Sequence, residues 1–181
     1  MEKVKIRKMT LCSLFVTLII VGSFIKVPIP YIPFTLQFLF TNLSGVILGA
    51  NLGALSVFLY LFMGLIGLPV FTEGGGVFYI FKPTFGYLIG FLVGTYVSGK
   101  FLEKKEKNFK NILIASIINI LIVYIIGVIY LYIISNFYLG GNLSIKNAII
   151  YGAALPVIGD LILCLISAEI GKRILSIGEV L

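Results

Sequence analysis

The chain has 181 residues, of which 60% are hydrophobic and 12% are charged. Soluble domains are usually about 45–50% apolar and about 25% charged, so this composition excludes an ordinary globular domain and a disordered chain. Histidine is absent, which removes the commonest general base and the commonest metal ligand. We therefore expect a membrane protein that is not an enzyme and has neither a metal site nor a cofactor.

Six apolar stretches follow one another along the chain and predict six transmembrane helices, since a span needs about 20 predominantly apolar residues. The second and third stretches meet at residues 50–51, so we expect them to form a tight antiparallel pair. We predict an all-α membrane protein, a compact six-helix bundle that makes one substrate-binding domain of residues 1–181. The stretches cover residues 9–25, 36–50, 52–68, 83–98, 112–135 and 147–170.

Lysine and arginine are distributed unevenly between the two sides that six spans define. The amino end, residues 100–110 and the carboxyl end hold all but three of the 14 cationic residues. The loops at the other ends of the spans contain only Lys26, Lys82 and Lys146. Because cationic loops remain on the cytoplasmic side, we expect both termini inside and these loops outside, in a multi-pass protein of the cell membrane.

Small residues at intervals of four allow helix backbones to approach closely in lipid. We interpret two such series as sites of packing within the chain, with a partner interface as the alternative. Ser13 and Thr17 make a similar strip on the first span, which is a weak indication of a partner surface. The two glycine series are Gly45, Gly49 and Gly53, and Gly86, Gly90 and Gly94.

Asp160 is the outstanding residue because it lies inside an apolar span, shortly after Pro156. An ionised carboxylate at membrane depth is costly unless it faces a polar cavity or a partner. We expect it to bind a ligand or an ion; the alternative is a buried contact with another helix. Glu169 is different, since it precedes Lys172 and Arg173 and is expected to form an ion pair at the membrane boundary.

The loops on the expected outer side supply further candidate binding groups. Residues 74–76 are three glycines, which either fold over a ligand or form a flexible turn, since glycine permits close backbone approach. Lys82 either neutralises Glu73 or attracts an anionic ligand to the start of the next helix, where the dipole also favours negative charge. The other candidates are Thr35, Gln37, Tyr79, Thr84 and Tyr87.

Four motifs in order along the chain resemble the BioY family, the biotin-binding S components of energy-coupling factor (ECF) transporters. Residues 32–37 read IPFTLQ, and residues 67–71 read GLPVF before the three glycines. Residues 83–91 read PTFGYLIGF, and residues 159–161 read GDL. The order of the motifs makes the resemblance specific, and it extends from the first span to the sixth.

The resemblance implies a biotin transport subunit with six helices, which binds biotin from the outer side under its first and third inter-helix loops. It also implies a complex with a transmembrane T protein and two ATPase subunits. In the family an Ala-x-x-x-Ala strip on the first span meets the T protein, and Ser13 and Thr17 stand there in this chain.

Two positions depart from the family pattern. Phe85 stands where a second glycine is usual, and Leu163 stands where the family commonly has lysine, three residues after the aspartate. If that lysine contacts the aspartate or the ligand, another donor must replace it here. The candidates are Lys82, Gln37 and Asn119.

Biotin suits the candidate residues chemically. Its ureido ring has two N–H donors, for which the Asp160 carboxylate is a strong acceptor, and one carbonyl, for which Gln37 is a donor. The apolar bicycle would pack on Phe71, Tyr79 and Tyr87. The valerate carboxylate would take N–H groups of Gly74, Gly75 and Gly76, or Lys82.

Two other functions remain as alternatives. The first is an ion-coupled secondary carrier for a small vitamin-like solute that uses Asp160. It is disfavoured because Asp160 is the one carboxylate deep in a predicted span. A membrane enzyme is disfavoured because no paired acid and base groups are apparent. The chain has no ATPase motif, so a biotin subunit would depend on its partners for energy.

Overall fold

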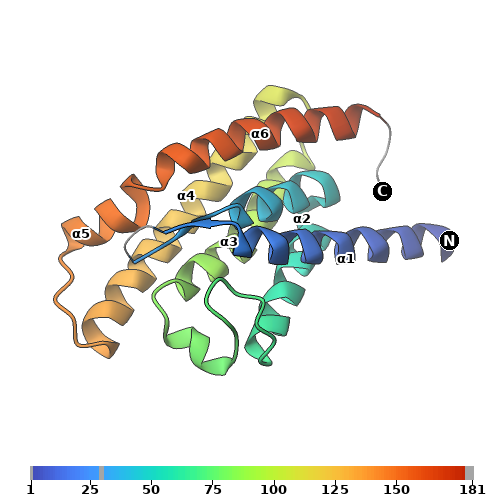
Figure 1. Ribbon diagram of the computed structural model, residues 1–181. Helices are drawn as coiled ribbons and strands as arrows, with labels where there is room; N and C mark the ends of the chain where they lie inside the picture. Colours follow the sequence, from blue (N-terminus) through green and yellow to red (C-terminus); the bar gives the residue numbers. More distant parts are fainter. Residues whose placement is uncertain (1, 29–30, 178–181) are drawn as a thin grey trace.

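In the ranges 2–28 and 31–177, which the computed structural model describes, five helices are long and apolar enough to cross a membrane (Figure 1). The predicted all-α class is therefore confirmed. Residues 1, 29–30 and 178–181 of the predicted domain lie outside the described residues. The long helices are α1 (Glu2–Phe24), α2 (Gln37–Leu65), α3 (Phe85–Leu102), α4 (Phe109–Ile133) and α6 (Val157–Ser176).

Short elements form much of the connections between the long helices. Two strands, which pair antiparallel, follow α1, and a 3₁₀ helix precedes α3. Two π-helical turns and one short α-helix lead from α4 to α6. In chain order these elements are β1 (Lys26–Val27), β2 (Phe34–Thr35), η1 (Val77–Phe81), η2 (Ile134–Tyr138), α5 (Ile145–Ile149) and η3 (Ile150–Ala154).

The predicted turn between the second and third spans is a kink inside α2. Gly49 has φ 79° and ψ −178°, a conformation open to glycine because it has no Cβ. A Cβ on Gly53 would lie 2.7 Å from the Ser44 carbonyl oxygen, so the segments before and after Gly49 pack together, as expected. The non-helical residue lies one position before the predicted join at residues 50–51, and the described residues do not confirm a count of six long helices.

The last predicted span is interrupted shortly before Asp160. Pro156, which has no N–H to donate, is the N-cap of α6, and its carbonyl oxygen accepts the Asp160 N–H at 3.0 Å. Proline is favoured at helix starts because the first N–H groups have no intrahelical acceptor. The π-helical turn η3 and Pro156 therefore interrupt the regular α-helical hydrogen bonding within the apolar segment Ile145–Ser176, and Asp160 follows in the first turn of α6.

The glycines of α3 bring this helix against α4. A Cβ on Gly90 would lie 2.8 Å from the Val123 Cα, and one on Gly94 would lie 2.1 Å from Asn119 Oδ1. Gly86 meets α4 in the same way. These are contacts within the chain, so packing explains the glycine series of α3 and the partner alternative is not needed for it.

The helices surround a common core in which α3 packs between α2 and α4. α1 packs on α2, and α6 packs on α4 and α2. Cys12 and Cys164 are both buried free thiols, as expected for small apolar side chains. The start of α1 and the end of α6 lie toward the same end of the bundle, at the right of Figure 1.

Candidate functional site

A pocket lies between α2, α3, α4 and α6, beside the connections that follow α1 and α2. The ≈ 580 Å³ of empty space in and in front of it includes open solvent, and the cavity itself has a volume of ≈ 60 Å³. Phe38, Phe91 and Val123 line it from three different helices, and we call these three residues the pocket floor. The Phe38 and Phe91 ring centroids lie 6.3 Å apart, so the floor is apolar and largely aromatic.

Asp160 is the one charged residue among the described residues that line the pocket. Its side chain is 8% exposed, and the Tyr124 hydroxyl donates to Oδ2 at 2.5 Å. No ion pair and no further side-chain donor to this carboxylate occurs in the described ranges. Asp160 therefore has one fixed oxygen and one that is available to a ligand.

Gln37 stands at the start of α2 and brings a second polar group into the pocket. The residue is 2% exposed, and its Nε2 has no hydrogen-bond partner among the described residues. The neighbouring Thr35 also lines the pocket, and its hydroxyl accepts the Gln37 backbone N–H at 3.3 Å. The Gln37 side chain lies close to the buried Tyr60 hydroxyl, which has no partner among the described residues either. Because buried donors are normally paired, the amide has two candidate acceptors, this hydroxyl and a ligand in the pocket.

Three further predicted residues form the side walls. The Tyr87 hydroxyl donates to the Gly152 carbonyl at 2.7 Å, which joins α3 to the π-helical turn η3. The Thr84 hydroxyl donates to the Tyr79 hydroxyl at 3.4 Å. Burial raises the pKa of the Tyr79 hydroxyl, so this wall remains neutral at physiological pH.

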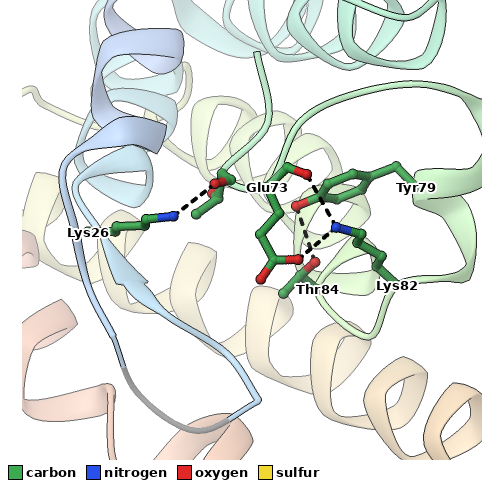
Figure 2. A network of polar contacts seen from close by, with 6 residues as sticks. Lys26, Glu73, Tyr79, Lys82 and Thr84 are labelled. Atoms are coloured by element: carbon green, nitrogen blue, oxygen red, sulfur yellow. Dashed lines mark hydrogen bonds and ion pairs between the residues drawn. The ribbon is translucent and has the colours of Figure 1, made fainter. Parts of the chain in front are cut away.

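The connection from α2 to α3 is held by the contacts shown in Figure 2. Lys82 pairs with Glu73 at 2.8 Å, and its Nζ lies 4.9 Å from the centroid of the Tyr79 ring. Lys26, from the ribbon after α1, donates to the Thr72 carbonyl at 3.1 Å. Both lysines are therefore held beside the pocket, next to residues that line it.

The predicted site residues separate into two groups. Those that line the pocket are Thr35, Gln37, Tyr79, Thr84, Tyr87 and Asp160. Those that are not among its lining residues are Phe71, Gly74, Gly75, Gly76 and Lys82. The second group supports the first, since all its members belong to the connection that carries Tyr79.

Phe71 and the glycines have structural contacts in this connection. Phe71 is fully buried between Tyr60 and Tyr79, with ring centroids 5.3 Å and 4.5 Å away. The Gly74 N–H donates to the Phe71 carbonyl at 3.2 Å, and the Gly76 N–H donates to Gly64 at 2.7 Å. These two N–H groups are already paired, so they are not free to bind a carboxylate in this conformation.

Lys82 and Glu169 each form an expected ion pair, Lys82 with Glu73 and Glu169 with Arg173. The Lys82–Glu73 pair supports the neutralising role for Lys82. Arg173 donates to Glu169 at 2.6 Å near the end of α6, which confirms the predicted pair at that position.

Tyr124 is the most important lining residue that the sequence did not indicate. It lies within a stretch that is apolar on every side, where one more aromatic residue carries no signal. The short distance from Asp160 depends on how α4 and α6 pack, and no motif connects the two residues. Thr72, Phe34 and Pro156 also line the pocket without having been predicted to bind ligand.

Asn119 is not available as the replacement donor. Its Nδ2 donates to Asn42 Oδ1 at 3.0 Å, and Asn42 Nδ2 donates to the Ser116 hydroxyl at 2.7 Å. All three residues are fully buried, and we call them the floor cluster. Asn42 and Asn119 each lie about one helical turn from a pocket-floor residue and are not among the residues that line the pocket.

Ser13 and Thr17 lie on an exposed side of α1. Their hydroxyls donate to carbonyls of their own helix, at Met9 and Ser13, both at 3.1 Å. The strip therefore presents small side chains with satisfied hydroxyl donors. Whether a partner covers it stays a prediction.

Several apolar helices, together with a pocket that contains one buried carboxylate, define a multi-pass membrane protein that binds a small molecule. A sequence model described as the BioY family matches residues 1–179. This chain belongs to the BioY family. Membership in a family of transport proteins confirms the expectation that the chain is not an enzyme.

Named relatives and one solved structure agree with this family. A protein named probable biotin transporter BioY, from Lysinibacillus sphaericus, is 38% identical over 93% of this chain and 87% of its own length. The biotin transporter BioY of Rhizobium etli is 31% identical over 93% of each chain. The crystal structure of the S component for biotin from an ECF-type ABC transporter matches with a TM-score of 0.87 and 26% identity. That match covers 99% of this chain and 96% of the other.

Proposed function

We propose that this chain is the biotin-binding membrane subunit, the S component, of an ECF transporter in the cell membrane. The observation that carries the proposal is a buried carboxylate with one available oxygen in a largely apolar pocket. Membership in the BioY family and the likeness to an S component for biotin support the same conclusion. We treat residues 1–181 as one substrate-binding domain.

The pocket accommodates both ends of biotin chemically. The free oxygen of Asp160 accepts an N–H of the ureido ring, and the unpaired Nε2 of Gln37 donates to the ureido carbonyl. The apolar bicycle lies against the pocket floor and the rings of Tyr79 and Tyr87. The valerate carboxylate points toward the mouth, where Lys26 supplies positive charge while Glu73 neutralises Lys82.

The proposed topology has six crossings, because α2 counts as two. A straight helix of 29 residues would be about 44 Å long, whereas the hydrocarbon core is about 30 Å thick. The kink at Gly49 divides α2 into two packed segments. Six crossings bring both termini to the cation-rich side, which we assign to the cytoplasm.

The proposed partners are the transmembrane T protein and two ATPase subunits of an ECF module. The exposed strip of Ser13 and Thr17 supports a helix contact with the T protein, because small side chains let helices approach closely. The two ATPases would supply the energy for release and uptake.

Calorimetry of the purified protein in detergent tests the proposed substrate. Biotin should bind tightly and with a stoichiometry of about one, while thiamine and riboflavin should give no heat. Binding of another vitamin without binding of biotin would overturn the substrate and leave the architecture intact. Ion-dependent uptake into vesicles that contain this chain alone would instead favour the secondary carrier.

A further inference from the structure

The contact between Tyr124 and Asp160 joins α4 to α6 in the lining of the pocket. Tyr124 comes from α4 and Asp160 from the first turn of α6, and both side chains line the cavity. The phenol donates to Oδ2 at 2.5 Å. The contact fixes the carboxylate so that Oδ1 is directed to a ligand.

No cation accompanies this carboxylate among the described residues. The pocket lining contains neither lysine nor arginine, and Asp160 is in no ion pair. Leu163, at the position where the family commonly has lysine, is apolar and buried. The nearby lysines Lys26 and Lys82 are bonded to the Thr72 carbonyl and to Glu73.

We propose that the neutral hydroxyl of Tyr124 positions Asp160, and that the part of the pocket beside Asp160 consequently accepts a cationic donor head group as well as a neutral one. The proposal rests on the proposed binding of biotin. An ionised carboxylate without a neighbouring cation attracts a positive head group, whereas a lysine beside it would repel such a group. Tyr124 is thus a residue that determines specificity by acting through Asp160.

The probe for this inference is 2-iminobiotin, in which a cyclic guanidinium replaces the ureido group and carries a positive charge at neutral pH. It keeps the two ring N–H donors that face Asp160. Where biotin has a carbonyl it has an N–H donor, and Gln37 can present its amide oxygen there by rotation of the amide. Charge is therefore the main difference between the two ligands.

Calorimetric titration of the wild type with both ligands is the first measurement. We expect the Kd for 2-iminobiotin to lie within about tenfold of the Kd for biotin. Rejection of 2-iminobiotin by more than about a hundredfold, with biotin still bound, would overturn this inference alone. Failure to bind either ligand would overturn the proposed function as well.

Tyr124→Phe tests the positioning role, with Tyr130→Phe as its matched control. Tyr130 is also on α4 and donates to the Ile80 carbonyl outside the pocket. Tyr124→Phe should weaken biotin about tenfold, the effect of one hydrogen bond to a charged group, and Tyr130→Phe should leave the affinity unchanged. Equal effects of the two variants would overturn the positioning role.

Two further variants distinguish positioning from a structural contribution. In an Asp160→Asn background, Tyr124→Phe should have no additional effect on biotin affinity, because the two residues act as a unit. Leu163→Lys should weaken 2-iminobiotin at least about tenfold more than biotin. If Leu163→Lys does not fold, the double-mutant measurement decides, and additive losses would overturn the inference.

Discussion

Two buried polar clusters lie about one helical turn apart in this bundle and differ in what they leave unpaired. In the pocket, Asp160 has one available oxygen and Gln37 has an unpaired amide nitrogen. In the floor cluster, the amide groups of Asn42 and Asn119 bond to each other and to Ser116. Asn119 Oδ1 is the exception there, and Gly94 covers it.

The difference shows what separates a binding group from a structural one in an apolar environment. Both clusters avoid lipid, as polar groups at membrane depth must. The floor cluster joins α2 to α4 and is sealed from the pocket by Phe38 and Val123. The pocket cluster joins α4 to α6 and faces a cavity, so its unpaired atoms are available to a ligand.

The largest expected effect is the loss of biotin binding in Asp160→Asn. The amide can no longer offer a charged acceptor to the ureido N–H, and such hydrogen bonds contribute about 1.5–3 kcal/mol. We expect the Kd for biotin to rise about a hundredfold, measured by calorimetry in detergent, with no loss of thermal stability.

Glu169→Gln is the matched control, because it also removes a carboxylate from α6 but lies far along the helix and pairs with Arg173. Its biotin affinity should equal that of the wild type. Comparable losses in the two variants would show that the pocket cluster has no special part in binding.

Gly94→Ala tests the packing under the floor cluster. The new Cβ would lie 2.1 Å from Asn119 Oδ1, so α3 and α4 must separate or the amide must move. Overpacking of this kind costs about 1–3 kcal/mol, and we expect a lower melting temperature in detergent. Gly140→Ala is a poor comparison because Gly140 has φ 66°. Val93→Ala, on the exposed side of the same helix, is the better control.

Asn42→Ala should weaken the floor cluster without weakening the pocket. It removes the acceptor of Asn119 Nδ2 and the donor to Ser116. Interhelical hydrogen bonds in membrane proteins contribute about 0.6 kcal/mol on average, so the loss of two should cost about 1 kcal/mol of stability. Biotin affinity should change less than about threefold, and a larger change would mean that the two clusters are coupled through the pocket floor.

The sequence predicted the pocket cluster only in part, for a physical reason. Asp160 could be identified because a carboxylate inside an apolar span is expensive, and Gln37 because it belongs to a motif at the start of a span. Tyr124 could not be identified, because the stretch around it is apolar all round the helix. Its sequence therefore does not show which side of the helix faces the pocket. The role of Tyr124 depends on the packing of α4 against α6.

The fold was predicted to a similar extent. Apolar stretches and proline located the long helices and their connections, because hydrophobicity and the missing proline N–H act locally. The kink at Gly49 depends on tertiary contacts, among them the hydrogen bond from the Ala50 N–H to Glu103. Spacing alone also could not show that Gly49 bends a helix while Gly90 packs against one.

The smallest expected effect concerns Glu103, a carboxylate that is similar to Asp160 in chemistry but accessible to water. Its oxygens accept from Lys100 Nζ at 2.8 Å and from the Ala50 N–H at 3.3 Å, next to the Gly49 kink. The hydrogen bond from Lys100, with a smaller contribution from the Ala50 N–H, lowers the pKa of the Glu103 carboxyl. A lowered pKa in the folded state means that the stabilising contribution is present above the ordinary pKa of glutamate and is lost as pH falls through the lowered value.

Glu103→Gln should therefore be slightly less stable than the wild type at pH 7, by less than about 1 kcal/mol because the pair is exposed. The difference should begin to shrink below the ordinary pKa of glutamate, about 4.3, and disappear once the pH is below the lowered value of the wild-type carboxyl. Melting curves of both proteins between pH 7 and about pH 2 would measure this, and a difference that persists at the acidic end would refute an electrostatic origin. Because water screens Glu103 and not Asp160, the loss of its charge should leave biotin affinity unchanged, whereas the loss of charge at Asp160 should abolish tight binding.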